Sequence, residues 1–436
     1  MNRPSLAYNK LWVSAFFVMI VVAVAFIVPN FLYLVEDLGH RIPQEDMQTD
    51  YVIGVVWAII LGVSILAWPV SSRDKRCLLL VWLAKLIITL GFMLFYESHY
   101  PLDSYGYFDT SRQDSYIWEG FSYAGSSGGT HNVTRLAWLH HQLVPDSFHA
   151  LKISFAMLGL IAVYLFYRAA VLFLKREDRR VLYALALFPS ILFWSSGVGK
   201  EPIVLLIVAL HVYGVVGWYR TKMLRYFIIM LLGVIIMGFF RVWMVPIMLV
   251  SLVPLLVSAM RGVVAKTILL LFVLVACLLI TNKVQNILAV DTKQDMVAKV
   301  NNFSRGFARG GSARKASGKF TDISSMIAFV PKGSFTALFR PLPGEVMNSF
   351  GLLAGIENLF LLILLLLSLK HFRYNWRELQ DPLVLWAVLL VLTWAAVYGF
   401  VSSYNLGTAS RYRLQILPIL LGLLIYLARS RRIQKL

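Results

Sequence analysis

The sequence predicts an all-α protein that crosses a membrane many times. The chain has 436 residues, of which 59% are hydrophobic and only 14% are charged. Soluble domains carry about a quarter charged residues, so most of this surface is expected to face lipid. Backbone polar groups in hydrocarbon need internal partners, which predicts helices; a transmembrane barrel would instead alternate apolar and polar positions.

Twelve apolar runs are long enough, or nearly so, to cross a hydrocarbon core of about 30 Å. We expect helices over residues 11–34, 51–70, 77–96, 149–173, 181–196, 203–219, 226–240, 243–260, 267–281, 350–369, 382–401 and 412–428. The first run is too long for a signal peptide and lacks a small-residue cleavage site, so we expect a retained helix. The two runs around Arg241 are treated as separate, since joining them would invert every later helix.

Basic residues predict the orientation of these helices. The N-terminus, five short loops and the C-terminal tail lie on one side and hold 21 of the 41 Lys and Arg residues. The short loops on the other side hold only Arg41, Lys200, Arg241 and Arg411. Because short cytoplasmic loops are enriched in Lys and Arg, both termini are predicted to be cytoplasmic, and residues 1–436 to form one transmembrane domain.

Two long loops, over residues 97–148 and 282–349, are then external. The second carries ten cations and few acids, with Gly and Ser around Arg305, Arg309 and Arg314. It is either a solvated loop or a segment that grips an anionic chain. The net charge of +19 would suggest nucleic acid for a soluble protein, but here half of the cations are explained by topology and lipid headgroups. Cys77 and Cys277 indicate neither a disulfide scaffold nor a metal site.

The first long loop begins with a carboxylate and two tyrosines, Asp103, Tyr105 and Tyr107. Asp103 follows directly on a membrane exit, where a carboxylate could act as a general base toward a sugar hydroxyl or hold a divalent ion. The alternative is that Asp103 caps a short interfacial helix. The tyrosines are also typical of the aromatic belt at the interface.

The rest of that loop carries weaker signals. Asp109, Asp114 and Glu119 have no diagnostic spacing. His140 and His141 look like half of a metal site, but adjacent residues point apart on a helix, so no metal site is predicted.

Lys200 and Glu201 open the predicted helix that follows Ser195-Ser196-Gly197, with Pro202 in its first turn. Lys200 and the free N–H groups of this helix start make a candidate phosphate-binding corner. The Gly-x4-Gly-Lys-Ser/Thr pattern of a P-loop is absent. The alternative is that Lys200 and Glu201 only cap the helix and anchor it at the interface.

Arginines from three further segments map to the same outer boundary: Arg241, Arg340, and the pair Arg411 and Arg413. The planar guanidinium group binds phosphate oxygens with two hydrogen bonds. Several arginines that converge would therefore suit a phosphate or diphosphate leaving group. Glu345 follows Arg340 in a Pro-rich turn and is a second candidate catalytic carboxylate.

Three ionisable residues lie inside predicted helices: Lys85, His211 and Glu357. Intramembrane charges are costly, which makes them functional candidates. Lys85 is equally explained by a structural ion pair. Glu357 lies near the outer end of its helix, where it either faces a water-filled cavity or joins the catalytic carboxylates.

These features resemble the bacterial polytopic glycosyltransferases of the GT-C type and their relatives in exopolysaccharide and O-antigen assembly. The resemblance runs from about Asp103 to Pro418. Four features carry it: an Asp-x-Tyr in an early external loop, Phe188-Pro189-Ser190 followed by Trp194-Ser195-Ser196-Gly197, the pair Lys200-Glu201, and Arg411-Tyr412-Arg413. It implies that Asp103 is the catalytic base, that the outer cations hold a polyprenyl phosphate or diphosphate donor, and that the protein lies in the bacterial inner membrane.

The chain departs from that pattern in three ways. The key Asp follows the third predicted helix rather than the first, and no Asp-x-Asp motif is present. The Arg-x10-Gly spacing of O-antigen polymerases occurs at Arg340–Gly351 and Arg411–Gly422, but both glycines lie in apolar runs.

The sequence therefore predicts a membrane glycosyltransferase or polysaccharide polymerase that uses a lipid-linked sugar donor. We expect no cofactor, apart from a divalent cation if Asp103 holds one. The expected partners are the polyprenyl-linked donor and acceptor, membrane lipid and other polysaccharide assembly proteins, with no nucleic acid. A transporter or flippase for lipid-linked saccharide is the first alternative; it would need polar midplane groups from both halves. A non-catalytic partner of a polysaccharide synthase is the second.

Overall fold

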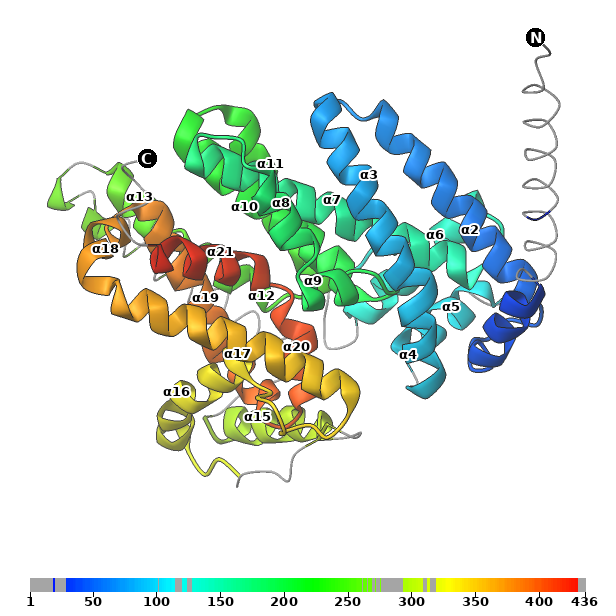
Figure 1. Cartoon of the computed structure of the whole chain (residues 1–436). Helices are drawn as coiled ribbons and strands as arrows, with labels where there is room; N and C mark the ends of the chain where they lie inside the picture. Colours follow the sequence, from blue (N-terminus) through cyan, green and yellow to red (C-terminus); the bar gives the residue numbers. More distant parts are fainter. Residues whose placement is uncertain are drawn as a thin grey trace, which may run out of the picture.

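A computed structural model describes residues 29–100, 102–113, 120–123, 128–260, 293–308, 312–313 and 319–429, with Met19 and short stretches between 262 and 275. The elements in these ranges are helices, and the only extended pairing among them is an isolated bridge between Ala313 and Asn405 (Figure 1). The prediction of an all-α chain is therefore confirmed for the part of the chain that is described.

The first two membrane-length helices form a hairpin. A helical stretch over residues 29–38 precedes α2 (Met47–Ser64), whose first turn is capped by Asp46, and a 3₁₀ turn over Ile65–Ala67 extends it. The chain returns through α3 (Ser72–Leu86), the π-helical η2 (Ile87–Phe92) and α4 (Met93–His99), which run on without interruption.

The middle of the chain contributes α7 (Phe148–Leu174), α10 (Lys200–Thr221) and α11 (Leu224–Phe240). Between α7 and α10 the predicted helix over 181–196 is divided into α8 (Arg179–Ala186) and α9 (Pro189–Trp194). The predicted helix over 243–260 is divided in the same way into α12 (Met244–Ser251) and α13 (Val253–Ala259). Each second piece has Pro in its first turn, because Pro cannot donate the hydrogen bond that would continue the preceding helix.

The last part of the chain contains α17 (Ser349–Lys370), α18 (Phe372–Leu379), α19 (Pro382–Ser402), α20 (Leu406–Arg413) and α21 (Leu417–Ala428). The predicted helix over 412–428 is wrong at its start, because α20 and α21 meet at a bend of 76°. Pro418 lies in the first turn of α21 and accounts for the break.

Six of the described helical spans are long and apolar enough to cross a membrane, and a seventh is obtained if α20 and α21 count as one bent span. α11, the α12–α13 pair and α16 (Ile323–Phe339) are shorter apolar helices. The predicted helices over 11–34 and 267–281 lie mostly outside the described residues. The chain is thus a multi-helix membrane protein.

Both predicted external loops contain helices. The segment 97–148 includes α5 (Asp103–Arg112) and α6 (Gly128–Leu143), and the segment 282–349 includes α15 (Lys293–Gly306) and α16. α16 begins with a capping box, in which the Asp322 carboxylate accepts the Ser325 N–H at 2.7 Å. The described parts of these two segments are therefore largely helical.

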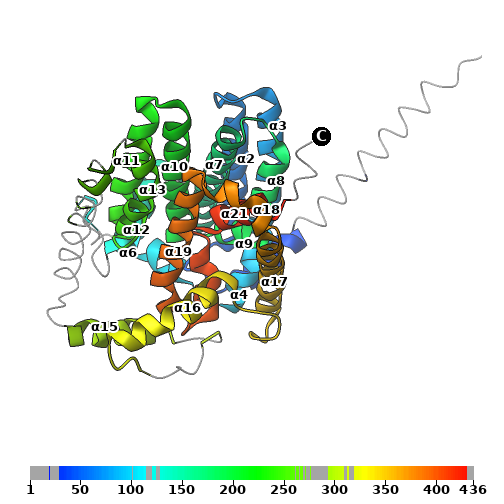
Figure 2. The same ribbon diagram turned by 90° about the vertical axis from the view of Figure 1, so that its left-hand side faces the viewer.

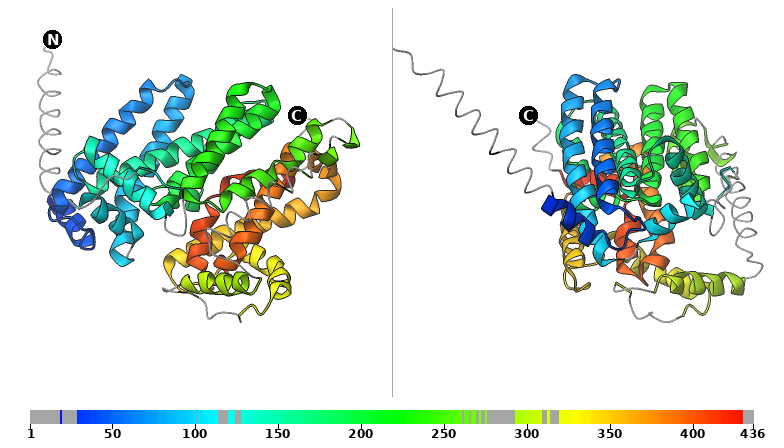
Figure 3. Two further views of the ribbon diagram at one scale, coloured as in Figure 1. Left: turned by 180° about the vertical axis from the view of Figure 1, so that it is seen from behind. Right: turned by 90° about the vertical axis from the view of Figure 1, so that its right-hand side faces the viewer.

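The helices form two neighbouring groups. The α2–α3 and α10–α11 hairpins pack with α7 in the first group, whereas α17, α19 and α21 form the second (Figures 1 and 3). The α2–α3 and α10–α11 turns lie toward one end of the molecule, and α4, α15 and α16 lie toward the other (Figure 2). Among the candidate residues, Asp103 and Lys200 begin helices α5 (Asp103–Arg112) and α10, and Arg241 directly follows α11.

Candidate functional site

The carboxylate of Glu201, in the first turn of α10, is the centre of a cluster of charges. Arg411 of α20 pairs with it: Nη2 donates to Oε2 at 3.0 Å, and Nε lies 2.9 Å from Oε1. Arg241, at the end of α11, approaches Oε1 with Nη2 at 3.5 Å. Both the Glu201 and Arg241 side chains are buried. Charges from three helix ends, more than 200 positions apart at the extremes, therefore meet in one place.

Asp103 joins this cluster from α5. Its Oδ2 lies 3.2 Å from Arg411 Nη1, and its side chain is 65% exposed, against 5% for Glu201. Asp103 is the first helical residue of α5; Leu102 is the N-cap, and no side chain caps this helix. The alternative of Asp103 as a helix cap is therefore wrong. One carboxylate oxygen is held by arginine while most of the side chain is open.

Lys200 supplies a further cation beside Glu201. Its Nζ donates to the Thr130 hydroxyl of α6 at 2.8 Å. The backbone of α6 comes close to the end of α11, since a Cβ at Gly129 would meet the Phe240 carbonyl oxygen at 2.3 Å. This close approach brings α6, α10 and α11 together at the cluster. The helix start at Lys200 also presents free N–H groups and the positive end of the α10 dipole.

Aromatic rings border the cations. The Arg241 guanidinium lies 4.3 Å from the ring centre of Tyr412 and 5.8 Å from that of Trp243. Its buried Nε has no hydrogen-bond partner among the described residues. Tyr107 is buried nearby, and burial together with the charges of Asp103 and Glu201 raises the pKa of its phenol. Tyr107 therefore stays protonated and can donate a hydrogen bond.

Tyr105, in contrast, has other contacts. Its hydroxyl donates to the Glu97 carbonyl at 3.2 Å, and its ring packs on Phe148. It anchors α5 to the ends of α4 and α7.

Arg340 and Glu345 form a separate pair. Arg340 Nε donates to Glu345 Oε2 at 2.8 Å, and the same oxygen accepts the Leu342 N–H at 2.8 Å. This contact closes the turn between α16 and α17. The expectation that Arg340 joins the other cations is not met in its described contacts, because a carboxylate five residues away on the same turn takes its guanidinium.

Arg413 and Glu357 are buried in a second polar region. Arg413 Nη1 donates to the carbonyls of Leu338 at 2.9 Å and Arg340 at 3.3 Å. Its Nη2 lies 4.0 Å from Glu357 Oε1, while Glu357 Oε2 accepts the Ser190 N–H at 2.7 Å. These contacts hold α20 against the end of α16 and so fix the position of Arg411, two residues earlier.

The intramembrane candidates have short-range partners. Lys85 Nζ donates to the hydroxyls of Ser195 at 2.6 Å and Ser196 at 3.1 Å, and His211 Nδ1 lies 3.3 Å from the Met230 carbonyl. The ion pair considered for Lys85 is absent from its described contacts.

Sequence reasoning missed two buried pairs of ionisable residues. Asp50 pairs with His149, and Glu97 with Lys152 at 2.7 Å. The spacing of His149 and Lys152, one turn apart at the start of a long apolar helix, was the available signal.

The remaining acidic and histidine candidates do not form a common site among the described residues. His140 Nε2 contacts the Ser154 hydroxyl at 2.9 Å and His141 Nε2 contacts that of Ser111 at 3.0 Å, so the two rings point to different partners. Asp109 is exposed, and Asp114 and Glu119 lie outside the described residues. Where the structure describes the chain, no three His, Cys, Asp or Glu side chains form a group that could hold a metal ion.

The cluster can do two things chemically. Three cations around two carboxylates leave a net positive charge that can hold an anion, and guanidinium groups suit phosphate oxygens. The open Asp103 carboxylate can accept a proton from a hydroxyl group beside that anion.

Comparisons with known proteins add no further identification: no family model, no curated protein and no solved structure matches this chain.

Proposed function

We propose that the chain is a bacterial inner-membrane glycosyltransferase or polysaccharide polymerase that transfers a saccharide from a polyprenyl phosphate or diphosphate donor at the outer face. The observation that carries this proposal is the Asp103–Arg411–Glu201–Arg241 cluster, which combines a solvent-open carboxylate with two guanidinium groups held by a buried carboxylate. The proposal includes twelve membrane crossings with both termini in the cytoplasm, which puts the cluster at the external boundary.

In the proposed reaction the open oxygen of Asp103 accepts the proton of an acceptor hydroxyl. The hydroxyl oxygen attacks the anomeric carbon of the donor sugar, and the bond between that carbon and the phosphate oxygen breaks. The developing negative charge on the phosphate is stabilised by Arg411, Arg241 and Lys200, with the start of α10 adding its dipole. Glu201 holds the two arginines in place and takes no proton.

A divalent cation at Asp103 stays a prediction of its own. Transfer activity that is lost with a chelator and restored by added Mg²⁺ or Mn²⁺ would support it. Unchanged activity in the chelator would exclude it.

A transporter or flippase for lipid-linked saccharide is the second candidate. The observation in its favour is the set of ionisable residues buried within the first helix group, the Asp50–His149 and Glu97–Lys152 pairs. Such groups mark substrate or proton paths in many membrane proteins. Against it, these pairs come from one part of the chain rather than from two matched halves.

The deciding experiment uses the purified full chain, a radiolabelled polyprenyl-linked saccharide and an acceptor. The enzyme proposal expects transfer by the wild type and no transfer by Asp103→Asn. Asp109→Asn is the matched control, because Asp109 lies on the same helix and is exposed. Both variants should elute and melt like the wild type.

Two outcomes would overturn the enzyme proposal. Normal transfer by Asp103→Asn would show that Asp103 is not the catalytic base. Absence of transfer by the wild type, combined with movement of labelled lipid across proteoliposomes, would favour the transporter; neither activity would favour a non-catalytic partner of a synthase.

A further inference from the structure

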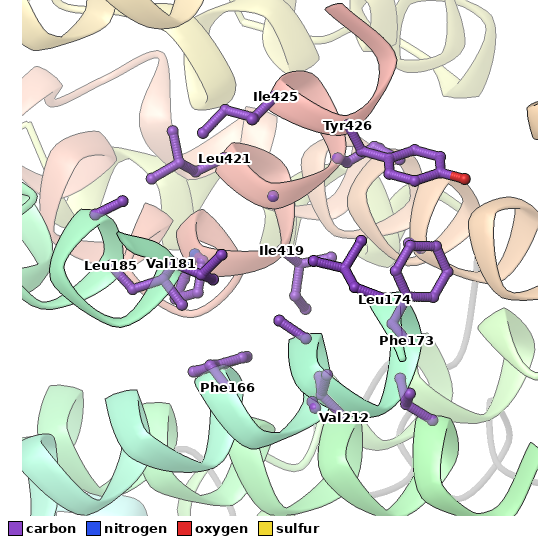
Figure 4. A pocket seen from close by; sticks show the side chains of 18 of the residues that line it. Phe166, Phe173, Leu174, Val181, Leu185, Val212, Ile419, Leu421, Ile425 and Tyr426 are labelled. Carbon is purple, nitrogen blue, oxygen red and sulfur yellow. The ribbon is translucent and has the colours of Figure 1, made fainter. Parts of the chain in front are cut away.

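A second site is formed by an apolar cavity away from the charge cluster. The cavity has a volume of about 480 Å³ and lies between α7, α8 and α10 on one side and α19 and α21 on the other (Figure 4). Phe166, Phe173, Val212, Leu421 and Tyr426 are among the side chains that line it. Its volume lies within the range of about 300–1,000 Å³ that is common for ligand pockets.

The cavity is distinct from the proposed transfer site. Asp103, Glu201 and Arg411 do not line it. On α10 its lining residues are Val212 and Val216, toward the end of the helix opposite to Lys200. The cavity thus lies on the side of the short basic loops.

Charged residues at one end of the cavity give it a polar rim. Arg176 and Asp178 come from the α7–α8 connection, Arg180 lies in the first turn of α8, and Arg429 follows α21. Arg176 lies 3.8 Å from Asp178, and Arg429 pairs with Glu378 at 3.3 Å. Arg180 is exposed, and its guanidinium makes no ion pair with any described residue. Positive charge therefore exceeds negative charge beside an apolar hollow.

We propose that this cavity binds an acyl chain of an anionic membrane phospholipid, with the phosphate at Arg180 and Arg176. An apolar hollow at a helix interface in a bilayer is filled by hydrocarbon, because water there would lose hydrogen bonds. The rim cations select an anionic headgroup in the leaflet on the basic side. This inference requires only that the chain lies in a bilayer and does not depend on the proposed transfer reaction.

Gly422 allows the cavity to be filled without a clash. It lines the cavity, and a Cβ added there would meet no atom within 4 Å. Gly422→Leu therefore places a side chain in the hollow while improving helix propensity in α21. Gly91→Leu is the matched control, since Gly91 has equally open surroundings and does not line the cavity.

The experiment measures lipid binding to the full chain in a mild detergent by native mass spectrometry. The probes are phosphatidylglycerol and phosphatidylcholine with identical acyl chains. In each lipid, one acyl chain carries a diazirine for cross-linking. Wild type and Gly91→Leu should prefer phosphatidylglycerol and cross-link to α7, α8 or α21. Gly422→Leu should bind it about tenfold more weakly, a change of about 1.4 kcal/mol.

The headgroup is tested separately. Arg180→Gln should reduce the preference for phosphatidylglycerol, whereas Arg180→Lys and Lys370→Gln should retain it. Lys370 is an exposed cation on the same side that does not line the cavity.

Three results would overturn the proposal. The first is equal binding of the two lipids by the wild type, and the second is undiminished binding of phosphatidylglycerol by Gly422→Leu. The third is displacement of phosphatidylglycerol by a long isoprenyl phosphate at a concentration below that of the phospholipid. The last result would assign the cavity to the sugar donor. Because Asp103→Asn should leave lipid binding unchanged, failure of the transfer proposal and failure of this one can be told apart.

Discussion

Glu201 is the residue on which the charge cluster depends. It is buried and faces Arg411 on one side and Arg241 on the other. An arginine buried without a carboxylate keeps its desolvation cost and loses the compensating attraction. The two arginines can therefore stay in place only while Glu201 is ionised.

Glu201→Gln should destabilise the protein by about 3–5 kcal/mol, the usual cost of removing one partner from a buried ion pair. The loss of stability is measured by unfolding the protein in detergent micelles with a chaotrope or with SDS. Glu177→Gln is the control, because Glu177 pairs with Arg179 but is about half exposed. Equal stability of the two variants would contradict the central role of Glu201.

His140 and His141 of α6 predict a pH dependence of stability. Burial lowers the pKa of His140 to about 4, and burial also lowers the pKa of His141. An unfolded histidine titrates near about 6.5, so between about pH 6.5 and 4 the unfolded chain binds protons that the folded chain does not. Stability is therefore complete above this window and falls as the pH drops through it.

Melting of the purified protein should accordingly shift to lower temperature between about pH 7 and about pH 5. His140→Gln, which keeps a polar group beside Ser154, should flatten this dependence. If the melting temperature of the variant depends on pH as strongly as that of the wild type, the titrating group is not His140.

Sorting the charges by their predicted side of the membrane selected three residues that the structure brings together. Lys200, Arg241 and Arg411 are exceptions to the basic-side rule, and all three lie around Glu201. Arg340 maps to the same predicted outer boundary, but side alone does not reveal its closer partner Glu345. Thr130, which holds Lys200, carries no signal of its own in the sequence.

Helix breaks were underestimated for a different reason. Hydropathy does not distinguish one long apolar helix from two short ones, so Pro189, Pro254 and Pro418 were the informative residues. The polar helices α5, α6 and α15 give no hydropathy signal, whereas Asp322 with Ser325 is a recognisable cap for α16. Secondary structure outside the apolar runs had to be read from such caps.

α16 and α19 pack backbone to backbone at two glycines. A Cβ at Gly399 would meet the Gly333 carbonyl carbon at 2.5 Å. Small residues allow such close helix contact in membranes, where dispersion and hydrogen bonds replace the hydrophobic effect.

Gly399→Ala should therefore cost about 1–3 kcal/mol through overpacking. Gly422→Ala is the control and should be neutral or stabilising, because its surroundings are open. Unfolding in mixed micelles compares the two. Full stability of Gly399→Ala would mean that the two helices can separate at no cost.

The orientation of the whole chain follows from the distribution of cations and can be tested directly. In a background without Cys77 and Cys277, Ser324→Cys at the start of α16 and Lys370→Cys at the end of α17 lie on opposite sides of the predicted membrane. A membrane-impermeant maleimide should label Ser324→Cys in intact cells and Lys370→Cys only after the membrane is opened. Labelling of Lys370→Cys in intact cells would invert the topology and place the charge cluster in the cytoplasm.

The bend between α20 and α21 joins two sites within one short stretch of chain. Arg411 belongs to α20, and Gly422 of α21 lines the apolar cavity. If both proposed ligands bind, a phospholipid that favours one position of α21 changes the free energy of placing Arg411 at the anion. By reciprocity, the anion changes the affinity for the phospholipid by the same factor. Under the two proposals, the composition of the bilayer is a thermodynamic effector of anion binding at the charge cluster.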